Sequence, residues 1–116
     1  MTADLARFLA EARALRQAAR DAGDQAFGAV VVKDGRVVGR GPSRVVTGRD
    51  PSAHAEMEAI RDAARTLKTQ DLSGCVLVST SRPCPMCEQA AYWAHVGRMV
   101  HGNDLEDAGA PADQRC

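Results

Sequence analysis

Two runs of β-branched residues flank a tight-turn dipeptide, and this arrangement constrains the fold more than any other part of the sequence. The valines lie in residues 26–33 and 36–39, and Asp34 and Gly35 stand between the two runs. An Asp-Gly pair tolerates the positive backbone φ angles that a two-residue hairpin loop requires. The sequence therefore predicts two antiparallel strands joined by a short turn.

Amphipathic helices are predicted on both sides of this hairpin. The first covers residues 3–21, where apolar residues recur at helical spacing, and Gly23 ends it. The second covers residues 53–67, with Ser52 as its N-cap. Each helix presents one apolar face, so we expect each to pack against the sheet.

The second half of the chain alternates between strand and helix signals. Residues 75–79 form a continuous apolar run typical of a buried, parallel strand. A short helix follows at residues 85–95, where a first-turn proline is tolerated, and residues 98–101 predict another strand. No periodicity is visible beyond about residue 103. This order predicts an α/β fold with helices on both faces of a mixed sheet.

The bulk properties favour one ordinary globular domain over residues 1–116, with a short tail from about residue 103. Fifteen basic and fifteen acidic residues cancel, which argues against a large nucleic acid as partner. No apolar stretch is long enough for a membrane span or a signal peptide, so we expect a cytoplasmic protein. Its four cysteines are then metal ligands or buried thiols rather than disulfides.

Two short strings carry residues suited to metal chemistry, and each opens a predicted helix. The first contains His54 and Glu56, and the second contains Cys84 and Cys87. Cysteines three positions apart on a helical turn can face one point, and helix N-termini favour the thiolate form. With His54 they make three ligands, which leave a tetrahedral zinc ion one open position, as in catalytic sites. We therefore expect one zinc ion per chain.

Glu56 stands two residues from the predicted histidine ligand, so it can lie beside the metal without binding it. The open position would take a water that zinc activates near neutral pH. Glu56 could then carry a proton from this water to a ring nitrogen and on to a leaving amine. The combined pattern H-x-E…P-C-x-x-C is typical of zinc deaminases.

Two other interpretations of the cysteine pair remain open. A thioredoxin-like dithiol also follows a strand and begins a helix, but it needs no upstream His-x-Glu. A structural zinc site would need a fourth protein ligand. The candidates for that ligand are Cys75, His95, His101 and Cys116.

At these residues the chain resembles the cytidine deaminase-like zinc deaminases. The nearest branch holds bacterial guanine deaminase, fungal-type cytosine deaminase and tRNA adenosine deaminase. The resemblance spans about residues 24–102 and rests on residues 27–30, 50–56, 59–61 and 83–87, while residues 91–94 look most like guanine deaminase. It implies a three-layer α/β/α sandwich around a mixed, five-stranded sheet, and a homodimer.

The resemblance also implies hydrolytic deamination of a small nucleobase or nucleoside-like heterocycle, with release of ammonia. A guanine-type substrate is favoured and a cytosine-type base comes next. The alternatives are a tRNA adenosine deaminase and a catalytically inactive, zinc-stabilised interaction domain. The neutral charge balance speaks against the tRNA substrate.

Three substrate contacts follow from the resemblance alone. It implies that Phe27 packs against the bound ring, that the Ala55 backbone N–H binds a ring substituent, and that Trp93 closes the pocket. Core or interface packing is the alternative role for Phe27 and for Trp93.

The chain departs from the pattern of its relatives at several positions. Ser43 stands where relatives carry an asparagine that binds the base, so the resemblance makes it a fourth substrate-binding residue, although a hydroxyl offers fewer hydrogen bonds than an amide. Arg82 replaces a glutamate at the mouth of the site, and Ala26 replaces a proline. Guanine deaminases also continue for tens of residues beyond the position of Cys116. Zinc chemistry survives these changes, whereas base specificity does not carry over.

Overall fold

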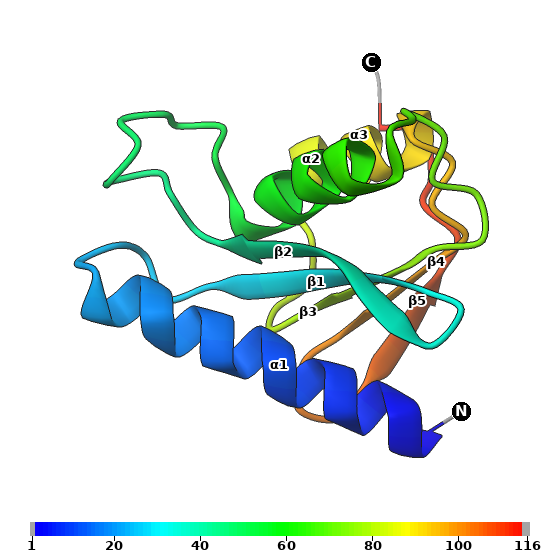
Figure 1. Ribbon diagram of the computed structural model, residues 1–116, viewed down its shortest axis with the longest axis horizontal. Coiled ribbons are helices and arrows are strands. Elements are labelled where there is room, and N and C mark those ends of the chain that lie inside the picture. The colour runs from blue at the N-terminus through cyan, green and yellow to red at the C-terminus, as the bar shows by residue number, and fades with distance from the viewer. Residues whose placement is uncertain (1, 115–116) are drawn as a thin grey trace.

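A five-stranded mixed sheet lies at the centre of the computed structural model, which describes residues 2–114 (Figure 1). The strand order across the sheet is β2-β1-β3-β4-β5. The elements along the chain are α1 (Thr2–Asp21), β1 (Gly28–Lys33), β2 (Arg36–Pro42), α2 (Ala55–Leu67), β3 (Val76–Ser79), α3 (Pro85–Trp93), β4 (Arg98–His101) and β5 (Glu106–Gly109).

The predicted hairpin is confirmed. β1 and β2 pair antiparallel, and both Asp34 and Gly35 adopt positive φ angles of 51° and 75°. On its other edge β1 pairs antiparallel with β3, and β3 pairs parallel with β4 through the α3 crossover. The α/β class, the mixed sheet and its five strands are therefore as predicted.

Helices cover both faces of the sheet, so the domain has three layers. Figure 1 shows α1 along one face, with α2 and α3 on the other. The side chains of β1 alternate between the two cores: Val30 and Val32 pack with Phe8 of α1, whereas Val31 packs with Ala59 of α2. The valine run is thus buried on both faces, which explains its lack of polar alternation.

Two local predictions differ from the structure. Ser52 is not the N-cap of α2: its hydroxyl donates to Asp50 Oδ1 at 2.7 Å, and the cap position falls to His54. The tail contains a fifth strand, β5, that local sequence patterns did not indicate, although the resemblance implied five strands. β5 pairs with β4 at the sheet edge and has no buried residue, so its formation depends on backbone pairing rather than on an apolar pattern. Within residues 2–114, no helix is long and apolar enough to cross a membrane.

A glycine in β2 lets the start of α2 approach the sheet closely. A Cβ atom at Gly41 would lie 2.0 Å from the Ala55 carbonyl oxygen and 2.5 Å from the Ala59 nitrogen. Neither atom can move without shifting the helix, because both belong to backbone. The absence of a side chain at this position therefore fixes the start of α2 against β2.

We expect Gly41→Ala to lower the free energy of unfolding by about 3 kcal/mol, because overpacking forces backbone shifts. Urea denaturation would measure this loss. Gly97→Ala is the matched control, since its Cβ would meet only the Cys75 carbonyl oxygen at 3.5 Å and its φ is not positive. Equal stability of the two variants would show that α2 is not held by this contact.

Candidate active site

The starts of α2 and α3 bring the three predicted metal ligands together. His54 is the N-cap of α2 and Cys84 is the N-cap of α3, both with extended backbones. Neither side chain caps its helix through a hydrogen bond, so the imidazole and the thiol remain free for another partner. Cys87 lies one turn into α3 and is completely buried. Residues 30 positions apart in sequence thus meet at one point.

The three ligand atoms have the spacing of a tetrahedral zinc site. His54 Nδ1 lies 3.5 Å from Cys84 Sγ and 3.6 Å from Cys87 Sγ, and the two sulfurs are 3.7 Å apart. Zinc bond lengths of about 2.3 Å to sulfur and about 2.05 Å to nitrogen place ligands about 3.6 and 3.8 Å apart at tetrahedral angles. The donor set and its geometry therefore fit zinc.

The candidates for a fourth protein ligand lie elsewhere. Cys75 is buried in the core between the sheet and α2, His95 faces Asp71 at 3.5 Å, and His101 faces Glu106 at 3.6 Å. Among residues 2–114, His54, Cys84 and Cys87 form the sole group with metal-binding spacing. Cys116 lies outside the described residues. A zinc ion held by these three residues would have one position open, as in catalytic zinc sites.

Burial raises the pKa of the Cys87 thiol well above its usual range, and the nearby Glu56 and Cys84 add to this effect. The preference of helix starts for the thiolate therefore does not by itself set the charge state of Cys87. Desolvation outweighs the helix dipole at this depth. A bound cation would instead favour the thiolate form of Cys87, because metal binding requires the deprotonated thiol.

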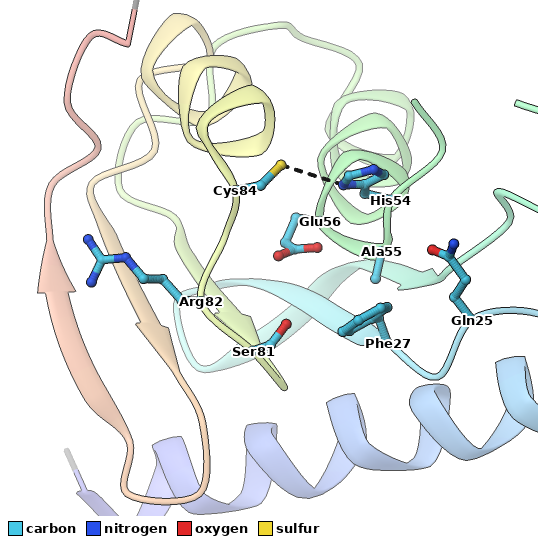
Figure 2. Close-up of a pocket in the computed structure, with 8 residues that line it drawn as sticks. All are labelled: Gln25, Phe27, His54, Ala55, Glu56, Ser81, Arg82 and Cys84. Carbon is cyan, nitrogen blue, oxygen red and sulfur yellow. Dashed lines mark hydrogen bonds between the residues drawn. The ribbon is translucent and has the colours of Figure 1, made fainter. Parts of the chain in front are cut away.

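Glu56 lies beside the centre without belonging to its ligand group. The residue is 6% exposed, and burial raises the pKa of its carboxyl to about 7, an effect that its own backbone N–H partly offsets. Figure 2 shows this carboxyl between the Cys84–His54 pair and Phe27. A carboxyl with a pKa near neutrality can both accept and return a proton, as a general acid and base must.

A cavity of about 160 Å³ adjoins two of the three predicted ligands, His54 and Cys84. Its walls are formed by Gln25, Phe27, His54, Ala55, Glu56, Ser81, Arg82 and Cys84 (Figure 2). The cavity is therefore a pocket in which a small ring could reach the metal centre and Glu56 together.

Two of the four predicted substrate-binding residues lie in this pocket and two do not. Phe27 and Ala55 line it. Ser43 is 3% exposed, is not part of the lining, and donates its hydroxyl hydrogen to Asp24 Oδ1 at 3.0 Å. Trp93 is 61% exposed and lines a separate hollow between α2 and α3. Within one chain, Trp93 therefore does not close the pocket as predicted.

The structure adds Gln25 and Ser81 to the pocket, which sequence reasoning missed. Both lie in connections: Gln25 follows α1, and Ser81 lies between β3 and α3. The one sign of their role in the sequence is that they lie close to the motif residues Phe27 and Cys84. Arg82 also lines the pocket, but its guanidinium points away from Glu56 and Phe27 in Figure 2.

Comparisons with known proteins agree with this geometry. Residues 2–103 match the family model described as the cytidine and deoxycytidylate deaminase zinc-binding region. Guanine deaminase of Bacillus subtilis is 44% identical over 82 residues, which cover 71% of this chain and 53% of that protein. Its crystal structure superposes with a TM-score of 0.80 at 41% identity, covering 83% of this chain and 62% of that chain.

Relatives that act on tRNA match as well. The tRNA(Ile)-lysidine synthase of Deinococcus radiodurans is 45% identical over 103 residues, which cover 88% of this chain but 18% of that protein. A structure from a study of tRNA:A34 deaminases gives a TM-score of 0.81 at 35% identity, covering 84% of this chain and 70% of that chain. The chain thus spans about half or less of these curated relatives. The matched region contains all three predicted ligands, and the chain belongs to the family of zinc-binding cytidine and deoxycytidylate deaminases.

Proposed function

We propose that this chain catalyses the zinc-dependent hydrolytic deamination of a small aminated nucleobase, with release of ammonia. The observation that carries the proposal is the buried Glu56 carboxyl, whose pKa is about 7, beside a three-ligand metal centre in a ring-sized pocket. A redox dithiol would need neither His54 nor Glu56 at this point. A purely structural metal site would need no pocket.

Each residue has a distinct task in this reaction. One zinc ion held by His54, Cys84 and Cys87 would supply an activated water. Glu56 takes a proton from the attacking water and delivers it to the ring nitrogen. It then takes the remaining proton from the hydroxyl added to the ring carbon and delivers it to the amine, so that the C–N bond breaks, ammonia leaves and the C=O bond forms. The exposed face of Phe27 gives the ring an apolar surface, and burial around Glu56 excludes competing water.

The pocket size supports a free base as substrate. A cavity of about 150 Å³ holds one benzene molecule, and this pocket measures about 160 Å³ and is open to solvent on one side. A guanine-type base is the leading candidate, because the Bacillus subtilis guanine deaminase is among the most similar relatives. A cytosine-type base follows. A tRNA adenosine is the alternative, supported by the similarity to tRNA:A34 deaminases and opposed by the net charge of zero.

Ammonia release tests these candidates directly. Zinc-quantified protein would be incubated with guanine, cytosine, adenine, their nucleosides and a tRNA with adenosine at the wobble position. Release from one free base would support the proposal and name the substrate. Release from tRNA alone would favour the alternative. No release at one zinc per chain would contradict both and favour an inactive, zinc-stabilised interaction domain.

We also propose that two copies of the chain associate. Helix α3 presents exposed Met86, Tyr92 and Trp93, and the hollow between α2 and α3 lies beside Trp93. Exposed apolar patches of this kind mark interaction surfaces. Sedimentation velocity on wild type and Trp93→Ser would measure the assembly, and a monomeric wild type at micromolar concentration would contradict it.

A further inference from the structure

Gln25 lines the pocket and carries a side-chain amide that has no assigned task. It lies in the connection between α1 and β1, and its backbone is fixed because its N–H donates to Asp24 Oδ1 at 2.8 Å and its carbonyl accepts from the Phe27 N–H at 2.9 Å. Figure 2 shows its side chain rising toward the start of α2, beside Ala55, with the amide oxygen on the pocket side. Its side-chain amide makes no hydrogen bond with any residue of the described chain.

Apart from the Ser81 hydroxyl, the other polar side chains of the pocket are occupied or turned away. His54 and Cys84 belong to the metal centre, and Glu56 transfers the proton. The Arg82 guanidinium points out of the pocket in Figure 2. Gln25 therefore carries the one side-chain amide on this wall, and it is free to bind a ligand.

Ser43 is not available to bind the ligand in this way, because its hydroxyl is bound to the Asp24 carboxylate. This carboxylate accepts four hydrogen bonds, from the Ser43 hydroxyl, the Gln25 N–H, and the Thr47 N–H and hydroxyl. The single hydroxyl hydrogen of Ser43 is thus committed to a carboxylate, outside the pocket lining. The three bonds from Ser43 and Thr47 tie the Gln25 segment to the loop before α2, which holds Gln25 in a fixed place relative to His54.

We infer that Gln25 is a specificity-determining residue whose amide binds the edge of the substrate ring; this inference rests on the proposed deaminase function. An amide offers an N–H donor and an oxygen acceptor side by side. It complements a ring edge that presents an acceptor beside an N–H, as lactam and cyclic amidine edges do. The substrate class is therefore an aminated heterocycle with such an unsubstituted edge, and alkylation of that ring nitrogen removes the match.

Substitution by leucine tests the inference, because leucine keeps the approximate volume and removes both hydrogen-bonding groups. The substrate is the base that wild type deaminates fastest, compared with its ring N-methylated analogue. We expect Gln25→Leu to lower kcat/KM for the base by about ten- to a hundred-fold and to discriminate less against the analogue. Zinc content and melting temperature should remain those of wild type.

Gln17→Leu is the matched control, since Gln17 lies exposed on α1 and its amide bonds Asp21 at 2.9 Å. Gln25→Asn provides a conservative variant that should retain part of the discrimination. Binding of the base can also be measured without turnover, in proteins that carry Glu56→Gln. Calorimetry would give the dissociation constant for Glu56→Gln alone and for the double variant that also carries Gln25→Leu. A weaker constant in the double variant would support the inference.

The outcomes separate this inference from the function on which it rests. If wild type releases ammonia and Gln25→Leu matches it in kcat/KM, in binding and in analogue discrimination, the Gln25 assignment is overturned while the deaminase function stands. If wild type neither deaminates nor binds any base of the panel, both are overturned.

Discussion

Glu56→Gln is expected to abolish turnover while the protein keeps its zinc. Glutamine preserves the size of the buried side chain but cannot exchange a proton, and Glu56 is outside the ligand group. General acid and base catalysis contributes about 10²- to 10⁴-fold in rate, and here one residue serves both steps. We therefore expect kcat to fall by at least about a thousand-fold, measured by ammonia release with zinc quantified in the same samples.

Glu58→Gln is the matched control for this experiment. Glu58 lies two residues further along α2 and pairs with Arg61 at 2.9 Å and with Arg44 at 3.6 Å, outside the pocket lining. Its loss should leave kcat within about two-fold, because partly exposed ion pairs contribute about 1 kcal/mol or less. Near-normal turnover by Glu56→Gln would remove Glu56 from the mechanism, whatever the metal content.

Glu56→Gln has a second expected effect, which concerns how the stability of chelator-treated protein depends on pH. Burial raises the pKa of Glu56 from 4.5 to about 7, so between these pH values the folded state holds a proton that the unfolded chain has released. The free energy of unfolding should therefore fall as pH rises through this window, by at most about 3 kcal/mol. Glu56→Gln should lack this fall. Parallel slopes in the two proteins would show that Glu56 ionises freely in the fold.

The sequence predicted those features that depend on local chemistry. Asp34 and Gly35 specified the hairpin because few dipeptides suit two successive positive φ angles. The spacing of Cys84 and Cys87 placed both sulfurs on one helical turn, and the structure brings them to 3.7 Å. In each case the controlling interactions lie within a few residues of one another.

Features that depend on distant parts of the chain could not be predicted in the same way. β5 has no apolar pattern, because its place at the sheet edge comes from pairing with β4. Ser52 resembles an N-cap locally, yet Asp50 takes its hydroxyl and the helix begins two residues later than that cap would require. The pocket lining likewise draws on Gln25 and Ser81, from connections 56 positions apart, which no spacing rule relates.

The second large effect is expected from Cys87→Ser, which should lose the zinc ion and much of the stability. The Cys87 sulfur is completely buried and accepts a hydrogen bond from the Met57 backbone N–H at the start of α2. Serine retains an oxygen acceptor for this N–H but is a poor zinc ligand, so the variant isolates the metal from the hydrogen bond. Because metal binding and folding are coupled, we expect a loss of at least about 3 kcal/mol and a melting temperature lower by roughly 10 °C or more.

A chelator distinguishes lost metal from damaged packing in this variant. Chelation should lower the melting temperature of wild type toward that of Cys87→Ser, and it should leave Cys87→Ser unchanged. Cys75→Ala, which alters a buried thiol of the core outside the ligand group, should keep one zinc per chain and should still respond to the chelator. Retention of a full zinc complement by Cys87→Ser would refute the ligand set. Loss of stability without any chelator effect on wild type would assign the role of Cys87 to packing, because α2 and α3 would then be held together by side chains rather than by a shared ion.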